Sequence, residues 1–182
     1  MHTQSLFRLP KDLIIREYRP EDLKACSNIY ASNIEDFLPP ALELLIDHLE
    51  GPFSYYLVLE TNGEIVGCGG LDMMAEANHA AFNFGMVRRD WHGQGLGSLL
   101  TLTRLALIEA ENDPAYFGLE TSIHTEPFYS RFGFERLSIP EQRYVGGTYF
   151  VSMGLWLPMK SRDEIRAELH QQPVHFDIEF PP

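Results

Sequence analysis

The chain has 182 residues, 45% of them hydrophobic and 22% charged, and it carries a formal net charge of -12. This length and composition predict one globular domain, and we find neither a run approaching the roughly 20 apolar residues of a membrane span nor a signal-peptide run at the start. The acidic charge argues against a nucleic-acid partner, because phosphate-tracking proteins carry basic stripes, and it favours a cationic partner such as an amine.

The chain contains two cysteines, Cys26 and Cys68. They are too few for a disulfide framework and lack the paired spacing of a zinc site. We therefore expect a cytoplasmic protein with no metal.

The first elements read as a strand and two helices. Leu13–Glu17 is a short strand candidate, and Pro20, followed by two acidic residues, predicts a helix that extends to about Ala31. Apolar residues recur at helical spacing over Leu42–Leu49. That recurrence predicts a second, amphipathic helix.

The next elements read as a hairpin, a further strand and a buried helix. Ser54–Glu60 and Glu64–Leu71 flank the turn Asn62-Gly63, and Asn-Gly between apolar runs is a strong hairpin signal. His79–Val87 is the following strand. The nearly apolar run Ser98–Glu111 predicts a helix that packs against the sheet.

The last elements are a strand, a short helix and two strands, over Phe117–Ser122, Pro127–Phe132, Phe134–Leu137 and Thr148–Leu157. After Pro158 the composition changes, and the capping-box spacing that starts at Ser161 predicts one more helix, Ser161–His170. Gln171–Pro182 shows little periodicity. We therefore expect a domain over residues 12–158 and a C-terminal helical tail over residues 159–182, which could pack against a second copy to form a homodimer.

The most informative segment is the glycine-rich run His92-Gly93-Gln94-Gly95-Leu96-Gly97-Ser98, between a predicted strand and a predicted helix. A tight turn at a helix N-terminus directs several backbone N–H groups at one point, where the helix dipole adds positive charge. Arg88, Arg89 and His92 gather here in an otherwise acidic chain. The segment therefore predicts a cradle for a phosphate or pyrophosphate.

Two common nucleotide motifs fail on spacing. A dinucleotide fingerprint that begins at Gly93 or Gly95 would need glycine where Ser98 and Leu100 stand. A P-loop would need a lysine after the glycines, and none follows. What remains is a short glycine pattern that opens a helix after a strand ending at Val87.

That pattern resembles the signature of the GNAT superfamily of acyl-CoA-dependent N-acetyltransferases, in which a valine ends a strand and Arg/Gln-x-x-Gly-x-Gly/Ala opens the next helix. His92 stands where the family has Arg or Gln. A second match is Phe128–Phe134, which resembles the family's aromatic-Tyr-x-x-x-Gly-Phe, and a third is Leu13–Arg16 followed by Arg19–Asp22. The resemblance covers residues 12–157.

The resemblance implies an α/β fold with a mixed, mostly antiparallel central sheet flanked by helices. It also implies transfer of an acetyl group from acetyl-CoA to a primary amine of a small molecule or peptide, by direct attack in a ternary complex. Cys68 lies mid-strand, so we expect no acyl-enzyme.

The resemblance assigns cofactor-binding roles to ten residues: Val87, Arg88, Arg89, His92, Gly93, Gln94, Gly95, Leu96, Gly97 and Ser98. The pantetheine arm would lie along the strand that ends at Val87. A main-chain N–H near Val87 or Arg88 would polarise the thioester carbonyl, and the pyrophosphate would bind the N–H groups of the glycine-rich turn.

Tyr129 corresponds to the family's usual general acid for the coenzyme A thiolate. Glu120 is the best remaining candidate for the base that deprotonates the amine, beside two alternatives, a merely solvated glutamate and an ordered water. Glu35 and Asp36 could attract a cationic amine or form a solvated loop. Two rival functions stay open: an acyl-CoA-binding regulatory module with little chemistry, and an interaction domain that binds no coenzyme A.

Overall fold

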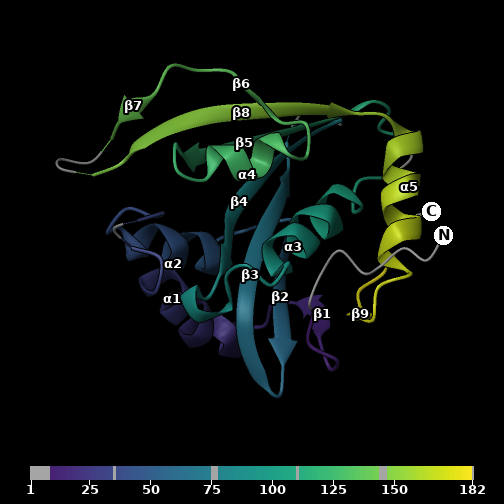
Figure 1. Cartoon of the computed structure of the whole chain (residues 1–182), viewed down its shortest axis with the longest axis horizontal. Helices are drawn as coiled ribbons and strands as arrows, with labels where there is room; N and C mark the ends of the chain where they lie inside the picture. The colour runs from purple at the N-terminus through teal and green to yellow at the C-terminus, as the bar shows by residue number, and fades with distance from the viewer. Residues whose placement is uncertain (1–8, 35, 75–77, 110, 144–146, 182) are drawn as a thin grey trace.

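The computed structural model describes residues 9–34, 36–74, 78–109, 111–143 and 147–181. Within these ranges nine strands form one sheet in the order β6-β8-β5-β4-β3-β2-β1-β9, with β7 beside β8 (Figure 1). The strands are β1 Ile14–Glu17, β2 Tyr55–Thr61, β3 Glu64–Met73, β4 His79–Val87, β5 Ala115–Ser122, β6 Glu135–Arg136, β7 Glu141–Gln142, β8 Tyr149–Leu157 and β9 His175–Asp177.

Most neighbouring strands run antiparallel, while β4–β5 and β1–β9 are parallel. The predicted mixed, mostly antiparallel sheet is confirmed. The helices are α1 Leu23–Ala31, α2 Leu42–Glu50, α3 Leu96–Leu105, α4 Glu126–Ser130 and α5 Met159–Leu169, with 3-10 turns at Pro20–Asp22 and Arg89–Trp91.

The sheet separates two hydrophobic cores. Leu57 and Leu59 of β2 belong to the core under α3, whereas Tyr56 and Val58 belong to the core under α1 and α2. Successive side chains of a strand point to opposite faces, so a strand buried on both faces is hydrophobic throughout. Figure 1 shows α1 and α2 together on one side of the central strands and α3 on the other.

Two features of β4 open the sheet. Its ladder with β3 shifts register between Cys68 and Gly70, at a bulge where Phe84 has φ +44°. Its pairing with β5 ends at Phe82 opposite Leu119, although both strands continue. Because β4 and β5 part beyond this pair, a cleft opens in the middle of the sheet.

Three expectations from the sequence are wrong in detail. The helix α3 ends at Leu105 rather than Glu111, because the buried run Ala106–Ile108 continues as turns. The last helix begins at Met159, after Pro158, and Ser161 does not cap it, so the capping-box spacing is not used. The strand β9 lies in the segment that showed little periodicity.

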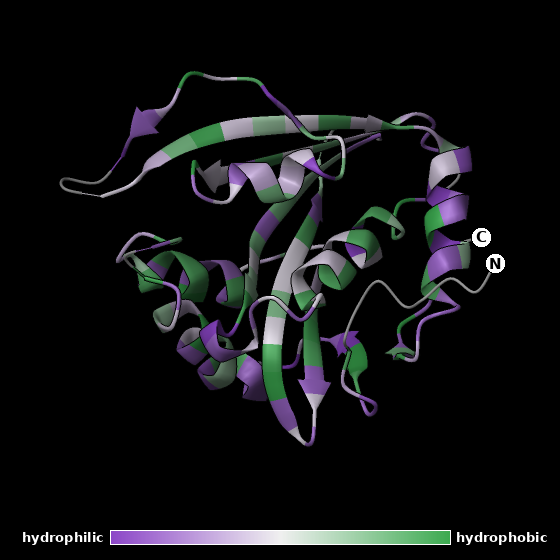
Figure 2. Ribbon diagram, viewed as in Figure 1, coloured by the Kyte–Doolittle hydropathy of each residue, from purple (hydrophilic) through white to green (hydrophobic). Residues whose placement is uncertain are grey.

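The tail is attached by polar contacts. Arg166 donates to the carbonyls of Ala106 (3.0 Å) and Ile108 (2.6 Å), and the fully buried Arg162 donates to that of Glu109 (3.2 Å). These carbonyls follow the end of α3. Figure 2 shows that α5 is mostly hydrophilic, in keeping with docking through hydrogen bonds. In the part of the chain that the structure describes, no helix is both long enough and apolar enough to span a membrane.

Candidate active site

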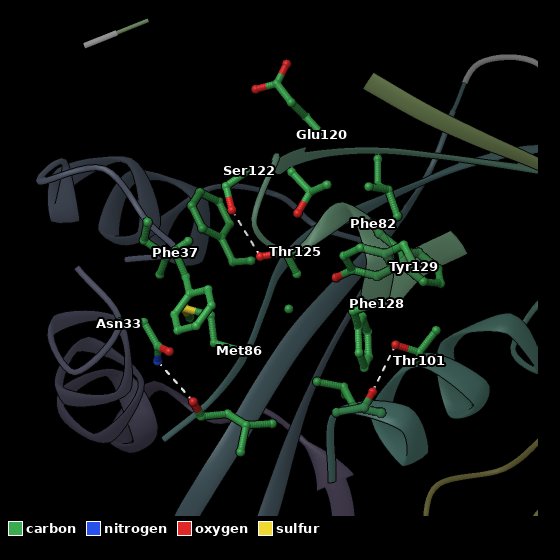
Figure 3. Close-up of a pocket in the computed structure, with 18 of the residues that line it drawn as sticks. Asn33, Phe37, Phe82, Met86, Thr101, Glu120, Ser122, Thr125, Phe128 and Tyr129 are labelled. Atoms are coloured by element: carbon green, nitrogen blue, oxygen red, sulfur yellow. Dashed lines mark hydrogen bonds between the residues drawn. The ribbon is translucent and has the colours of Figure 1, made fainter. Parts of the chain in front are cut away.

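A cavity of about 930 Å³ occupies the cleft where β4 and β5 part. Its walls come from the second half of β4, the end of β5, the N-terminus of α3, the helix α4 and the segment between α1 and α2. Figure 3 shows this arrangement, with Tyr129 and Phe128 on one side and Asn33 and Phe37 on the other. Elements far apart in the sequence therefore converge on one space.

The glycine-rich turn forms one end of this cavity. Gly93 and Gly95 have φ values of +77° and +92°, a region that L side chains rarely adopt. The first hydrogen bond of α3 runs from the Leu99 N–H to the Gly95 carbonyl at 3.0 Å, and no side chain caps the helix. The N–H groups of the first turn, Leu96 to Ser98, therefore remain free to bind an anion.

The neighbouring arginines are already paired. Arg88 donates to Asp90 (2.7 Å) and to Glu64 (3.2 Å), and the hydrogen bonds with Asp90 raise its pKa. Arg89 forms an ion pair with Asp36. Neither arginine lines the cavity, and nor does Gln94, whereas the other seven residues with predicted cofactor contacts do so: Val87, His92, Gly93, Gly95, Leu96, Gly97 and Ser98.

His92 holds the end of β4. Its Nε2 lies 2.8 Å from the Val87 carbonyl oxygen, which also accepts a hydrogen bond from Asn33 Nδ2 at 3.0 Å (Figure 3). The imidazole ring lies edge-on to Phe37, with 5.5 Å between centroids. His92 thus fixes the strand end next to the cradle, a role that the sequence did not indicate.

At the end of β4, the backbone N–H that faces the cleft belongs to Val87 and not to Arg88. The Arg88 N–H donates to the Val66 carbonyl at 2.8 Å, across the ladder with β3. Since hydrogen-bonding groups alternate between the two edges of a strand, the N–H of Val87 points to the open cleft. Of the two N–H groups, only that of Val87 thus faces the cavity.

Tyr129 lies on α4 and is 7% exposed. Its ring packs edge-on against Phe128 and Phe134, at 5.0 and 5.7 Å between centroids. In Figure 3 its hydroxyl points into the cavity. The structure thus places Tyr129 in the same space as the cradle.

Glu120 lies on β5 at the rim of the same cavity. Its carboxylate forms an ion pair with Arg143, which follows β7 and also lines the cavity. Figure 3 shows the Glu120 side chain pointing away from Tyr129. The side chains of Glu120 and Tyr129, the two predicted catalytic residues, therefore point in different directions.

Three further site residues escaped the sequence analysis. Asn33 lines the cavity through its hydrogen bond with the Val87 carbonyl, and Phe84 lines it at the bulge in β4, and no local pattern indicates either. Arg104 reads in the sequence as one polar residue on a buried helix. Glu35 lies outside the described residues, while Asp36 is the ion-pair partner of Arg89. Among the described residues, no group of three His, Cys, Asp or Glu side chains is placed to hold a metal ion.

Comparison with known families identifies the class of protein that has this parted sheet and glycine-rich turn. The model of the acetyltransferase (GNAT) domain matches residues 18–157. This chain belongs to the GNAT family and is an acetyltransferase.

Individual relatives differ in the acceptors that their names give. A Bacillus subtilis (strain 168) protein, provisionally named a [ribosomal protein bS18]-alanine N-acetyltransferase, is 27% identical over 136 residues, which cover 71% of this chain and 85% of that protein. Among solved structures, Ard1 from Thermoplasma volcanium has a TM-score of 0.65 at 23% identity and covers 80% of this chain and 97% of its own.

Two further structures share the fold. The ribosomal-protein-S18-alanine N-acetyltransferase from Escherichia coli has a TM-score of 0.64 at 20% identity, covering 81% of this chain and 94% of its own. An aminoglycoside 6'-N-acetyltransferase, solved in complex with coenzyme A, has a TM-score of 0.59 at 13% identity, covering 78% and 96%.

Proposed function

We propose that this acetyltransferase moves the acetyl group of acetyl-CoA to a primary amine, by direct attack in a ternary complex. The observation that carries the proposal is the continuity of one cavity from the free N–H groups at the start of α3 to Tyr129 and Glu120. A cytoplasmic setting fits the two free, buried thiols of Cys26 and Cys68.

In this account the pyrophosphate of acetyl-CoA binds the N–H groups of Leu96, Gly97 and Ser98. The two left-handed glycines allow the chain to approach it closely, and the helix dipole favours its charge. The N–H of Val87 points to the open edge of β4. It serves as the donor that polarises the thioester carbonyl.

The amine must lose a proton, because an alkylamine with a pKa of about 10.4 is almost wholly protonated at neutral pH. We assign this proton transfer to Glu120, directly or through one water. Its ion pair with Arg143 has to open for the amine to enter, so the cationic acceptor competes with the guanidinium. Tyr129 then protonates the departing thiolate.

Because one relative is named for an alanine residue of a ribosomal protein, the first acceptors to test are peptides with an N-terminal alanine. Small amines form the second group. The rim of the cavity is open enough at Glu120 and Arg143 for both kinds of acceptor, since these two side chains are 39% and 47% exposed.

The test is coenzyme A release from acetyl-CoA over a panel of such peptides, their N-blocked forms and small amines. We expect release with at least one free amine and none with its blocked form. Glu120→Gln and Tyr129→Phe should each lower kcat by about 10²-fold, the usual contribution of a general acid or base. Asp90→Asn, an exposed carboxylate outside the cavity, is the control and should leave kcat unchanged.

Acetyl-CoA binding without release for any amine would contradict transfer and would favour a regulatory module that binds acyl-CoA. If acetyl-CoA does not bind, the cradle has been misassigned.

A further inference from the structure

Arg104 is a charged side chain buried beneath the cleft. It lies on α3, is 1% exposed and touches the cavity wall. Its Nε and Nη1 donate to the carbonyls of Leu100 and Gly70, each at 3.3 Å, and its Cζ lies 4.0 Å from the centroid of the Phe82 ring. Among the salt bridges of the described residues, none pairs Arg104 with a carboxylate.

A buried guanidinium without a counter-charge is costly. Burial lowers the pKa of Arg104, but an arginine starts so high that it stays protonated in proteins. The carbonyls and the Phe82 ring offset part of the cost. A positive charge that stays buried here would be stabilised by a negative charge that develops nearby during the reaction.

The backbone is shaped to admit this side chain. A Cβ atom on Gly85 would lie 2.7 Å from Arg104 Nη2, and one on Gly69 would lie 3.3 Å from Nη1. Gly85 directly follows Phe84, the left-handed residue of the bulge in β4. The guanidinium therefore lies against the bulge, where β4 and β5 have just parted.

Tyr129 lines the same cavity as Arg104. Its side chain is near enough to the guanidinium to act on the pKa of Arg104, which it raises. Phe134 packs against both Phe82 and Tyr129, with 5.7 Å between centroids in each case. Aromatic rings thus pack against both the guanidinium and the phenol.

We propose that Arg104 is the positioning residue of the general acid: it holds the Tyr129 hydroxyl in the cavity and offsets the negative charge that develops there. This proposal rests on the proposed function. When the amine nitrogen bonds to the acetyl carbon, the carbon–sulfur bond breaks and its electron pair stays on sulfur. The sulfur takes the Tyr129 proton, and the phenolate that remains beside Arg104 regains a proton from the newly acetylated nitrogen through water.

The reference acidities show why such help matters. A free thiol has a pKa of about 8.5 and a free phenol about 10, so proton transfer from phenol to thiolate is about 30-fold unfavourable. A cation in contact with the phenolate opposes that imbalance. Arg104, which lines the same cavity and whose pKa the Tyr129 side chain raises, would supply this positive charge.

The experiment compares Arg104→Met, Arg104→Lys and Tyr129→Phe, alone and combined, with Thr103→Val as a control. Thr103 is equally buried on the same helix but does not line the cavity. For Arg104→Met we expect kcat to fall about 10²-fold with the KM for acetyl-CoA within about threefold of wild type. Arg104→Lys, which keeps the charge, should recover about a tenth or more of the lost rate.

The decisive comparison is made in the Tyr129→Phe background. There Arg104→Met should change kcat by less than about threefold, because the group that it positions is gone. An equal loss in both backgrounds, or a loss that Thr103→Val reproduces, overturns the proposal. Thermal unfolding of each variant identifies losses that come from a damaged fold.

A binding experiment tests this inference separately from the proposed function, because a binding titration needs no turnover. Coenzyme A and desulfo-coenzyme A are titrated into wild type and Arg104→Met at pH 9, where the free thiol is largely thiolate. We expect Arg104→Met to weaken coenzyme A binding about tenfold and to leave desulfo-coenzyme A unchanged. Equal weakening of both ligands contradicts the inference, even if no amine in the panel is acetylated.

Discussion

At the scale of single residues, several polar side chains act by holding other groups in place. His92 and Asn33 both bind the Val87 carbonyl, so the strand end beside the cradle is fixed from two elements. The sequence identified His92 by its position in a motif but not its partner, because a hydrogen bond to a strand carbonyl leaves no local pattern. Similarly, nothing in the sequence near Glu120 indicates its ion pair with Arg143.

Asp22 shows the same principle in the fold. Its carboxylate binds both Nη atoms of Arg16, at 2.7 and 3.0 Å, and the N–H of Arg19 at 2.8 Å. Burial alone would raise the pKa of Asp22, but these hydrogen bonds outweigh it and lower the pKa. A depressed folded-state pKa stabilises the protein above the unfolded value of about 3.9, and this stability is lost as the pH falls through the folded value.

We therefore predict that Asp22→Asn lowers the free energy of unfolding by about 2 kcal/mol at pH 7. The difference from wild type should shrink below about pH 4, as the native carboxylate is itself protonated. Urea unfolding between pH 3 and 7 measures both effects. A deficit that stays constant over this range would show that the ion pair is not the cause.

At the scale of elements, the order of strands and helices followed from periodicity and turn signals, because amphipathic runs and the Asn62-Gly63 turn are local. The element ends did not follow so well. The helix α3 stops at Leu105 inside an apolar run, and burial alone cannot tell a helix from a buried turn. The bulge at Phe84 and the parting of β4 from β5 depend on contacts between distant segments.

Two glycines allow a matched test of the cradle. Gly93 and Gly63 have φ values of +77° and +74°, and a Cβ on either would meet nothing within 4 Å. Each substitution by alanine should therefore cost a similar backbone strain, about 1 kcal/mol. Gly93 lines the cavity, whereas Gly63 lies in the β2–β3 turn.

We predict that Gly93→Ala weakens acetyl-CoA binding about tenfold and that Gly63→Ala leaves the affinity unchanged. Isothermal titration at equal protein stability makes the comparison. Equal affinities in the two variants would place the pyrophosphate elsewhere.

The attachment of α5 gives the second prediction at this scale. Arg166→Met leaves the carbonyls of Ala106 and Ile108 without their donor. Two buried acceptors without partners should cost about 2–4 kcal/mol in the free energy of unfolding, measured from urea midpoints. Lys160→Met, on the exposed side of the same helix, should change it by less than about 0.5 kcal/mol. Similar losses in the two variants would mean that the guanidinium contacts contribute little.

At the scale of the whole molecule, the tail after Pro158 packs against the rest of its own chain. The helix α5 covers the carbonyls that follow α3, and β9 extends the sheet beside β1. The sequence predicted the helix from a capping-box spacing at Ser161, which the structure does not use. A three-residue edge strand such as β9 is too short for periodicity to reveal, and its partner lies at the opposite end of the chain.

The cleft itself belongs to this scale. The glycine-rich turn is visible in the sequence because its pattern is contiguous, and the position of Tyr129 because a second motif accompanies it. The groups that complete the site include Asn33, in the turn after α1, and Arg104, on α3. The packing of these elements brings the two residues to the sheet. We propose that this cavity, completed by distant segments, binds acetyl-CoA.

Thermal unfolding with acetyl-CoA, NADH or ATP tests that claim most directly. A ligand at about 100 times its dissociation constant adds about 2.7 kcal/mol to the free energy of unfolding, which should raise Tm by about 5–10 °C. We predict this rise with acetyl-CoA and a much smaller one with NADH and ATP. In Gly93→Ala the rise should be about half as large, because a tenfold weaker affinity leaves about 1.4 kcal/mol. An unchanged Tm at millimolar acetyl-CoA would contradict the account.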